Sequence, residues 1–427
     1  MEHRRLPVRP DLDQLRHQAK DLLRAIQRGE PAALAELQHY HREPVRPADA
    51  GLADAQLVLA RSYQASSWPR LAQACQLADA IWDDDIETVR DLVTNNPTML
   101  HEDVLIRRDS NWGPPMTYAA NVGRDAIITM LRDLGATDFE SAIGRAALQG
   151  RTSTVRMIHR WLGSPKPPKD ALGGPAYTLN VAGTAILFEL GARVYDDDGG
   201  RLAPVDVVLC SDSRSPTRKH GVLEQYERHG FVFPDTPVMA LHRGRVDLLE
   251  AHLARDPGLL RRTFTHAEIF PPELGCGAYV DTQGTPLDGS TLLHMCVDWD
   301  EVAIAAWLLE RGADANATAA VDVDGFGGHT PLFNAVVAYS HFWANYDSYG
   351  PPSRKDDAVF ATMFLDRGAD PNARASLRRE IQQMGRGARV WHEHRDATPL
   401  AWGDRFPYKL LVSKRALAVV TERGGGR

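Results

Sequence analysis

The 427-residue sequence lacks several features that mark common protein classes. Its four cysteines are scattered and form no CxxC pair, which argues against a cysteine-rich zinc site and favours reduced, buried thiols. No segment approaches the roughly 20 consecutive apolar residues of a membrane span, and the polar, arginine-bearing start has no apolar signal core. We therefore expect a cytoplasmic protein. The cysteines are Cys75, Cys210, Cys276 and Cys296.

Signatures of catalysis and of phosphate binding are also missing. The sequence contains no H-E-x-x-H, G-x-S-x-G or G-K-[ST] motif, so no cofactor is expected. A formal net charge of −7 gives no overall attraction for nucleic acid or for an anionic membrane. With 43% hydrophobic and 25% charged residues, the composition is that of a chain that folds throughout.

What the sequence does contain is an internal repeat. The clearest unit is DGSTLLHMCVDWDEVAIAAWLLERGADAN at residues 288–316, in which a turn, a short helix, a second apolar helix and a glycine-terminated loop are expected in order. A unit that begins with T-P-L-H-x-A and recurs at about 33 residues is the ankyrin signature. Thr291, Leu293, His294 and Cys296 stand at four of these places, while Leu292 replaces the proline.

The chain therefore resembles the ankyrin-repeat family. Leu308, Leu309 and Gly312 begin a match to the family's L-L-x-x-G-A-D-x-N ending, and further starts appear at HTPLFNAVV (329–337) and ATPLAWGDRF (397–406). The resemblance implies an all-α solenoid of stacked helix-turn-helix units and gives His294 a structural role in the turn. Weaker copies lie at residues 77–97, 114–136, 142–163, 181–192 and 236–257.

These matches predict three parts: an N-terminal helical cap at residues 1–76, a repeat array at 77–420 and a flexible tail at 421–427. Asp11 is a capping candidate for a helix over 12–27, and Pro31 begins a second one to about residue 40. The runs LADAQLVLAR and SWPRL, at 52–61 and 67–71, resemble a helical leader found on some bacterial ankyrin proteins, which implies a bacterial source.

Residues that depart from the repeat at its exposed places are the candidates for binding. Asp298, Trp299 and Asp300 end the first helix of the clearest unit, where Asp300 replaces the customary glycine. An exposed tryptophan between two carboxylates suits a basic or amphipathic ligand. The alternative is a tryptophan that packs against the neighbouring repeat. If the first interpretation holds, Asp298→Ala is close to neutral, whereas Leu309→Ala removes core packing.

Two insertions add to these candidates. The one at about 340–357 is rich in aromatic, asparagine and serine residues, as adaptable binding loops are. The other, at about 261–287, precedes the clearest repeat, so both are expected near Trp299. The alternative is that the loops only cover an edge of the array. The candidate binding residues in the first insertion are His341, Phe342, Trp343, Tyr346, Asp347 and Tyr349.

Two function classes follow. The first is a binding scaffold that takes a protein or peptide partner on its concave face, with no membrane partner. The alternative is a small-molecule binder or enzyme, in which the groove and the insertions form a pocket and His266, Asp281, Asp298 and Asp300 supply acid–base groups. The missing motifs make us lean against an enzyme.

The C-terminal third holds two further patterns. His392 and His394 flank Glu393, and on an extended segment both imidazoles point to the same side, although two histidines make an incomplete metal site. Residues 374–389 carry five arginines against one glutamate, a pattern that suits an acidic partner or RNA but is also typical of a solvated face. We expect neither a metal nor a nucleic-acid partner.

Overall fold

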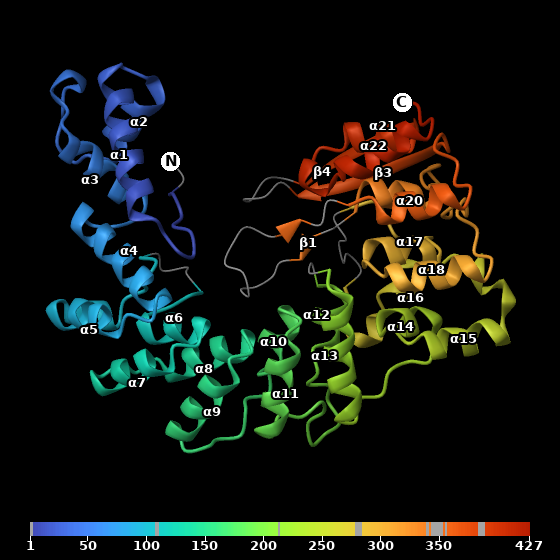
Figure 1. Ribbon diagram of the computed structural model, residues 1–427, viewed down its shortest axis with the longest axis horizontal. Coiled ribbons are helices and arrows are strands. Elements are labelled where there is room, and N and C mark those ends of the chain that lie inside the picture. The colour runs from blue at the N-terminus through green and yellow to red at the C-terminus, as the bar shows by residue number, and fades with distance from the viewer. Residues whose placement is uncertain are drawn as a thin grey trace. The chain divides into compact units, whose positions relative to one another are not determined.

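The computed structural model describes residues 3–106, 111–211, 214–277, 284–338, 341–342, 353–354, 357–382 and 389–427. They form two compact units, residues 1–167 and 168–427, and each is described by itself (Figure 1). Most of the secondary structure is helical. Among the described residues, no helix is both long and apolar enough to cross a membrane.

Unit 1 begins with three helices and continues with three helix pairs. The side chain of Asp11 accepts hydrogen bonds from the backbone N–H groups of Asp13 and Gln14, which confirms the predicted cap of the first helix. The elements are α1 (Leu12–Gln27), α2 (Pro31–Tyr40), η1 (Pro47–Asp49), α3 (Leu52–Ser62), α4 (Trp68–Trp82), α5 (Ile86–Asn95), η2 (Pro97–Leu100), α6 (Pro115–Val122), α7 (Asp125–Asp133), α8 (Phe139–Leu148) and α9 (Thr152–Trp161).

The first helix pair of unit 1 starts earlier than the sequence suggested. Helix α4 runs through the boundary expected at residue 76, so part of the segment assigned to the cap belongs to this pair. Along the unit, α4 packs on α6 and α6 on α8, while α5 packs on α7. Small side chains such as Ala119 and Ala146, both completely buried, allow the first helices of successive pairs to approach closely.

Unit 2 contains six helix pairs, two short strand pairs and short connecting helices among its described residues. The elements are α10 (Gly173–Tyr177), α11 (Val181–Glu189), α12 (Val205–Leu209), α13 (Pro216–Arg228), α14 (Pro237–His242), α15 (Val246–Arg255), η3 (Pro257–Leu260), α16 (His266–Ile269), η4 (Pro272–Leu274), α17 (Leu292–Asp298), α18 (Val302–Glu310), α19 (Pro331–Val336), β1 (His341–Phe342), β2 (Ser353–Arg354), α20 (Val359–Asp366), β3 (Ala375–Gln382), β4 (Arg389–Ala397), α21 (Pro399–Arg405), η5 (Lys409–Leu411) and α22 (Lys414–Glu422).

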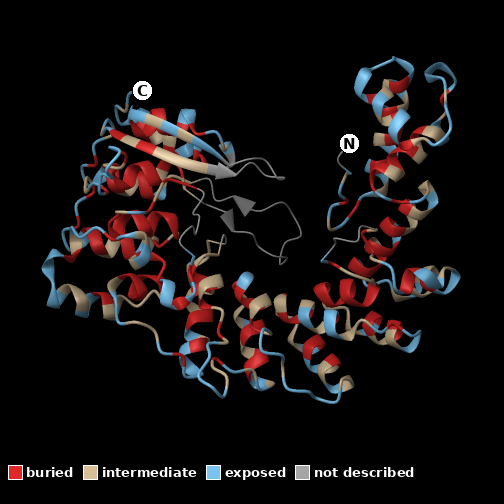
Figure 2. Ribbon diagram, turned by 180° about the vertical axis from the view of Figure 1, so that it is seen from behind, coloured by how far each residue is buried: buried red, intermediate tan, exposed pale blue. Residues whose placement is uncertain are grey.

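The C-terminal pairs of unit 2 stack in a regular ladder. The first helices contact in the order α14, α17, α19 and α21, and the second helices in the order α18, α20 and α22. Figure 2 shows that buried residues lie where these helices face one another, while exposed residues follow the loops. Leu309 near the end of α18 is only 5% exposed, as expected for a residue of this core. Continuity of the array from unit 1 into unit 2 stays a prediction.

The expectation of an all-α fold is wrong in the last third of unit 2. Strands β3 and β4 form an antiparallel hairpin in which Arg379 pairs with His392 and Ile381 with Val390. From Trp391 to Arg395, exposed residues alternate with half-buried ones, which is a period of two rather than the helical 3.6. A second, shorter strand pair, β1 with β2, lies within the insertion at 340–357.

The predicted glycine positions after second helices are confirmed. Gly312, which follows α18, has φ +92°, and Gly368, which follows α20, has φ +84°, so both lie in the left-handed region that glycine adopts without a Cβ penalty. Asp300, between α17 and α18, takes the same kind of conformation with φ +60°. This residue serves the turn between paired helices, where the family usually has glycine.

The predicted structural role of His294 is confirmed by its hydrogen bonds. Its Nδ1 accepts from the backbone N–H of Thr291 at 3.2 Å and lies 2.9 Å from the Thr291 hydroxyl. Its Nε2–H donates to the carbonyl of His329, and the Nε2–H of His329 donates in turn to the carbonyl of Pro286, both at 3.0 Å. Two buried histidines therefore link successive repeats through hydrogen bonds to backbone carbonyls.

These two histidines predict a loss of stability in acid. Burial lowers the pKa of His294 to about 3 and that of His329 to about 4, against an ordinary value of 6.5. In the unfolded chain these two imidazoles bind protons near pH 6.5, while in the folded chain they stay neutral to lower pH. The stability that the neutral imidazoles contribute is therefore present above pH 6.5 and is lost as the pH falls toward 4 and 3. The free energy of unfolding, measured with urea at several pH values between about 6 and 4, should fall less steeply with decreasing pH in His294→Gln than in the wild type. The difference in slope should correspond to about one bound proton. An unchanged slope would contradict this assignment.

Candidate functional site

Trp299 was expected on the surface, and the structure buries it. The residue is 3% exposed, and its ring stacks on the imidazole of His242, with a centroid distance of 3.9 Å. The Nζ atom of Lys219 lies 4.3 Å from the ring centroid, and Phe270 meets the ring edge-on. The ring is covered because α13, α14 and the residue that follows α16 contribute these side chains around the end of α17. This packing was not visible in the repeat pattern.

Asp298 is also buried, with 1% of its surface exposed. Its Oδ2 forms an ion pair with Nη2 of Arg214 at 2.9 Å, and the Nε of Arg214 donates to the Asp298 carbonyl at 2.5 Å. The Oδ1 atom has no hydrogen-bond partner among the described residues. A carboxylate in this setting anchors α17 to the segment before α13, and it does not face a ligand on the surface.

The remaining predicted site residues that the structure describes are Asp300, in the turn directly after Trp299, and His266, His341 and Phe342. His266 is partly exposed and its Nε2 lies 3.3 Å from the carbonyl of Gly277. His341 and Phe342 form strand β1, paired with Arg354 and Ser353. Outside the described residues lie Asp281, Trp343, Tyr346, Asp347 and Tyr349. Their proposed binding role stays a prediction.

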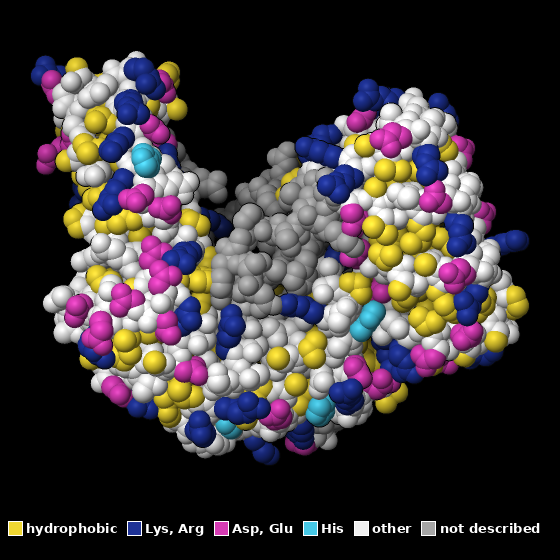
Figure 3. All heavy atoms as spheres, in the orientation of Figure 1, with side chains coloured by type: hydrophobic (Ala, Val, Ile, Leu, Met, Phe, Trp, Pro, Cys, Tyr) yellow, Lys and Arg dark blue, Asp and Glu magenta, His cyan; other side chains and the backbone are white. Residues whose placement is uncertain are grey.

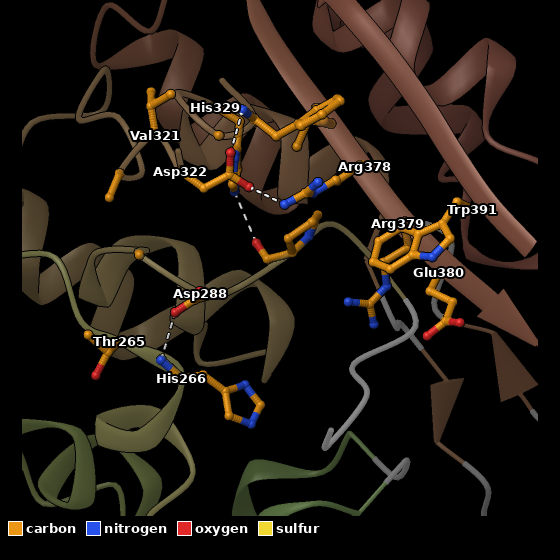
Figure 4. Close-up of a pocket in the computed structure, with 16 residues that line it drawn as sticks. Thr265, His266, Asp288, Val321, Asp322, His329, Arg378, Arg379, Glu380 and Trp391 are labelled. Atoms are coloured by element: carbon orange, nitrogen blue, oxygen red, sulfur yellow. Dashed lines mark hydrogen bonds and ion pairs between the residues drawn. The ribbon is translucent and has the colours of Figure 1, made fainter. Parts of the chain in front are cut away.

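A different cavity does stand out in unit 2. It has a volume of about 490 Å³ and lies between the loops that lead into α17 and α19 and the β3–β4 hairpin. Figure 4 shows Thr265, His266 and Asp288 on one side of it and Glu380 and Trp391 on the other. Its further lining residues are Pro286, Gly289, Ala320, Val321, Asp322, Phe326, Gly327, His329, Leu377, Arg378 and Arg379. We call this cavity the loop–hairpin groove.

An arginine and two aromatic rings form one wall of the groove. The guanidinium of Arg378 contacts Asp322 and Asp324 at 2.8 Å each, and its Cζ lies 4.8 Å from the ring centroid of Phe326 and 5.8 Å from that of Trp391. The Phe326 N–H donates to Asp322, which lowers the pKa of that carboxyl, and the Asp324 N–H and Arg378 act in the same direction. The charge of Arg378 is therefore balanced within the wall.

Asp288, on the opposite side, carries a charge without such balance. Its Oδ1 accepts a hydrogen bond from the His266 backbone N–H at 2.7 Å, and the side chain is exposed. Within the described part of the chain, no ion pair involves this carboxylate. The groove thus presents the exposed Asp288 carboxylate on the side opposite the hairpin wall that carries Trp391, an arrangement that suits a cationic or aromatic side chain of a ligand.

The histidine that lines the groove beside Pro286 is engaged in the fold. His329 is buried, donates to a carbonyl and has its pKa lowered to about 4 by burial, so it is neutral at pH 7 and engaged in structure. In the described ranges, no group of three or more His, Cys, Asp or Glu side chains is placed to hold a metal ion. His394 packs edge-on against Trp402, and burial lowers its pKa.

Sequence analysis did not single out Asp288 or Trp391 as groove residues. Trp391 is 57% exposed, which makes it one of the most exposed large apolar side chains in the described part of the chain. The signal that could have found it is the alternation in VWHEHR, which predicts a strand with Trp391, Glu393 and Arg395 on one face. Of the arginines in the segment 374–389, Arg374 pairs with Asp396 and Arg378 with two aspartates, while Arg386 lies outside the described residues. Figure 3 shows Lys and Arg side chains over the hairpin.

The comparison with protein families agrees with the repeat pattern at the clearest unit. Residues 288–320 match the model of the ankyrin repeat. No curated protein matches the chain significantly in sequence. Among solved structures, the chain is similar to the human ASB11 ankyrin repeat domain, with 15% identity and a TM-score of 0.26, over 73% of this chain and 99% of that domain.

Proposed function

We propose that this chain is a binding scaffold that takes a protein partner in the loop–hairpin groove. Ankyrin repeats in general mediate contacts between proteins, and the ankyrin match covers the repeat that contributes Asp288 to the groove. The observation that carries the proposal is an open cavity of about 490 Å³ with an exposed tryptophan on one wall and an exposed carboxylate on the other.

The chemistry of the two walls specifies the kind of contact. Tryptophan and arginine are enriched among the residues that dominate binding energy at interfaces, and both occur in the hairpin wall at Trp391 and Arg378. We expect a lysine or arginine of the partner in the groove, because the Asp288 carboxylate supplies charge and the Trp391 ring can supply a cation–π contact. The partner therefore presents a basic side chain to the groove.

Affinity capture from the lysate of the native host tests this proposal. Asp288→Lys reverses the charge at this position of the groove, while Glu310→Lys makes the same reversal at an exposed position of α18 outside the groove. We expect Asp288→Lys to lose a partner that the wild type and Glu310→Lys retain. Equal recovery with both variants, or loss with both, would refute a role for the groove.

The insertion at 340–357 remains our candidate for a second contact of the same partner. Its first residues follow α19 closely, and α19 lies next to α17 in the ladder. In the same capture, a variant that lacks residues 340–356 should recover less partner than the wild type.

A small ligand is the alternative occupant, because 300–1,000 Å³ is the usual volume of such pockets. The observed volume lies within this range. Two results together would favour a small ligand. Asp288→Lys would retain the protein partner, and a small cationic compound would bind the wild type with a saturable heat that Asp288→Lys does not show.

A further inference from the structure

Residues 3–10 lie against the first helices of unit 1 without forming a helix or a strand of their own. The backbone N–H of Arg4 donates to the carbonyl of Ser62 at 2.8 Å, and its guanidinium contacts both carboxylate oxygens of Glu36, at 2.8 and 2.9 Å. Leu6 is buried. The first half of this stretch, which we call the N-terminal segment, is therefore held by α2 and α3.

A backbone carbonyl in the second half of the segment is bound by α6. The hydroxyl of Tyr118 donates a hydrogen bond to the carbonyl of Val8. The Nε1–H of Trp82, at the end of α4, donates in turn to the Tyr118 hydroxyl at 2.6 Å, so two buried rings fix the position of this donor. A donor aimed at a main-chain carbonyl accepts any residue in that place, because every residue carries the same acceptor.

The next residue of the segment, Arg9, is bound through its side chain. Its Nε donates to Asp79 at 2.7 Å, and its Nη2 contacts both oxygens of Asp83, at 2.8 and 2.9 Å. Its Cζ lies 5.9 Å from the ring centroid of Trp82. Two carboxylates beside an indole suit a guanidinium, since its planar fork of N–H groups reaches both acids. We call Asp79, Trp82 and Asp83 the arginine site.

The contacts of Arg9 lie at the surface and are open to exchange. The side chains of Arg9, Asp79 and Asp83 are 42%, 43% and 61% exposed. Ion pairs at this exposure contribute little to stability, and ordering an irregular segment costs conformational entropy. In the described part of unit 1, Arg9 is the cation that contacts both carboxylates. Its departure leaves two negative groups beside an aromatic ring.

We propose that the arginine site binds an arginine-bearing segment of another protein, in competition with the N-terminal segment of this chain. The partner supplies a guanidinium in the place of Arg9 and a backbone carbonyl in the place of Val8. Charge favours a basic segment, because two carboxylates face a single guanidinium at this site. The inference concerns unit 1 alone and does not depend on the proposed partner of the loop–hairpin groove.

A peptide with the sequence of residues 3–10 tests the site. The peptide carries a fluorescent label, and fluorescence anisotropy measures its binding to the wild type and to a variant that lacks residues 1–10. The wild type should bind it roughly tenfold or more weakly than the truncated variant, because the site is occupied within the chain. The same peptide with Arg9→Glu should lose roughly tenfold or more in affinity for the truncated variant, since its carboxylate is repelled.

Two substitutions in the truncated variant locate the binding. Asp83→Asn removes one charge of the arginine site and should weaken peptide binding severalfold. Glu140→Gln makes the same change at an exposed position of α8 and should leave the affinity unchanged. If the truncated variant does not fold, as judged by circular dichroism, full-length Arg9→Ala takes its place, because this change removes exposed contacts alone. It should also bind the peptide more tightly than the wild type.

Four outcomes would overturn the proposal. One is the absence of peptide binding to the folded variants, and another is equal affinity for these variants and the wild type. The third is an affinity that neither Arg9→Glu in the peptide nor Asp83→Asn in the protein changes. The fourth is a wild type that dimerises in sedimentation and an Arg9→Ala variant that does not, which would assign the site to the N-terminal segment of a second copy.

Discussion

Replacing Asp298 by alanine is expected to destabilise the protein by about 3–5 kcal/mol, the usual loss when one partner of a buried ion pair is removed. The reason is the guanidinium of Arg214, whose side chain is 7% exposed and loses its carboxylate. The denaturation midpoint in urea measures the effect. The repeat pattern alone led to the opposite expectation, a nearly neutral substitution.

A double-mutant cycle separates the ion pair from other effects of the substitution. If the pair carries the loss, Arg214→Ala with Asp298→Ala costs less than the sum of the single changes. Asp298→Asn serves as a size-matched control that removes the charge alone. A loss below about 1 kcal/mol for Asp298→Ala would mean that the carboxylate is exposed, contrary to the structure.

Truncation of Leu309 is the second change with a large expected effect. The side chain is 5% exposed in α18, whose neighbours α17 and α20 belong to adjacent parts of the ladder. Leu309→Ala should cost about 2–5 kcal/mol, because it removes buried methyl groups and leaves a cavity between stacked repeats.

An exposed valine provides the control for this truncation. Val323 lies fully exposed in the loop before α19, so Val323→Ala should shift the urea midpoint little. Similar midpoints for the wild type and Leu309→Ala would show that α18 does not hold the repeats together.

The sequence was sufficient for most of the helical organisation. The capping residue Asp11 and the first-turn proline Pro31 predicted the starts of α1 and α2, because these signals act within one turn of the backbone. The repeat spacing predicted the α17–α18 pair and the left-handed Gly312 in the same way. Local signals of this kind do not depend on the rest of the fold.

Burial at the end of α17 could not be predicted, because it depends on a segment far away in the chain. Trp299 and Asp298 occupy places that are exposed in an ideal repeat. Here Lys219 and Arg214 come from the irregular region around α13 and cover them. A single sequence gives no signal that joins residues about 80 positions apart.

The groove was missed for a different reason. The composition of residues 374–389 is typical of a solvated, arginine-rich stretch or of a patch for an acidic partner, and the alternation in the following VWHEHR was used only for its two histidines. The hairpin that this alternation forms carries Trp391 and Arg378 to the loops of two repeats. Recognising the strand period would have placed Trp391 beside the array before its structure was known.

Photo-crosslinking in the native host tests the central claim most directly. A benzophenone amino acid is placed at His266, which lines the groove, and at Glu310, on the exposed part of α18. The account predicts a covalent adduct between this chain and a different protein from position 266, and none from position 310. Adducts from position 310 alone, or none from position 266 in cells where both variants are folded, would contradict it.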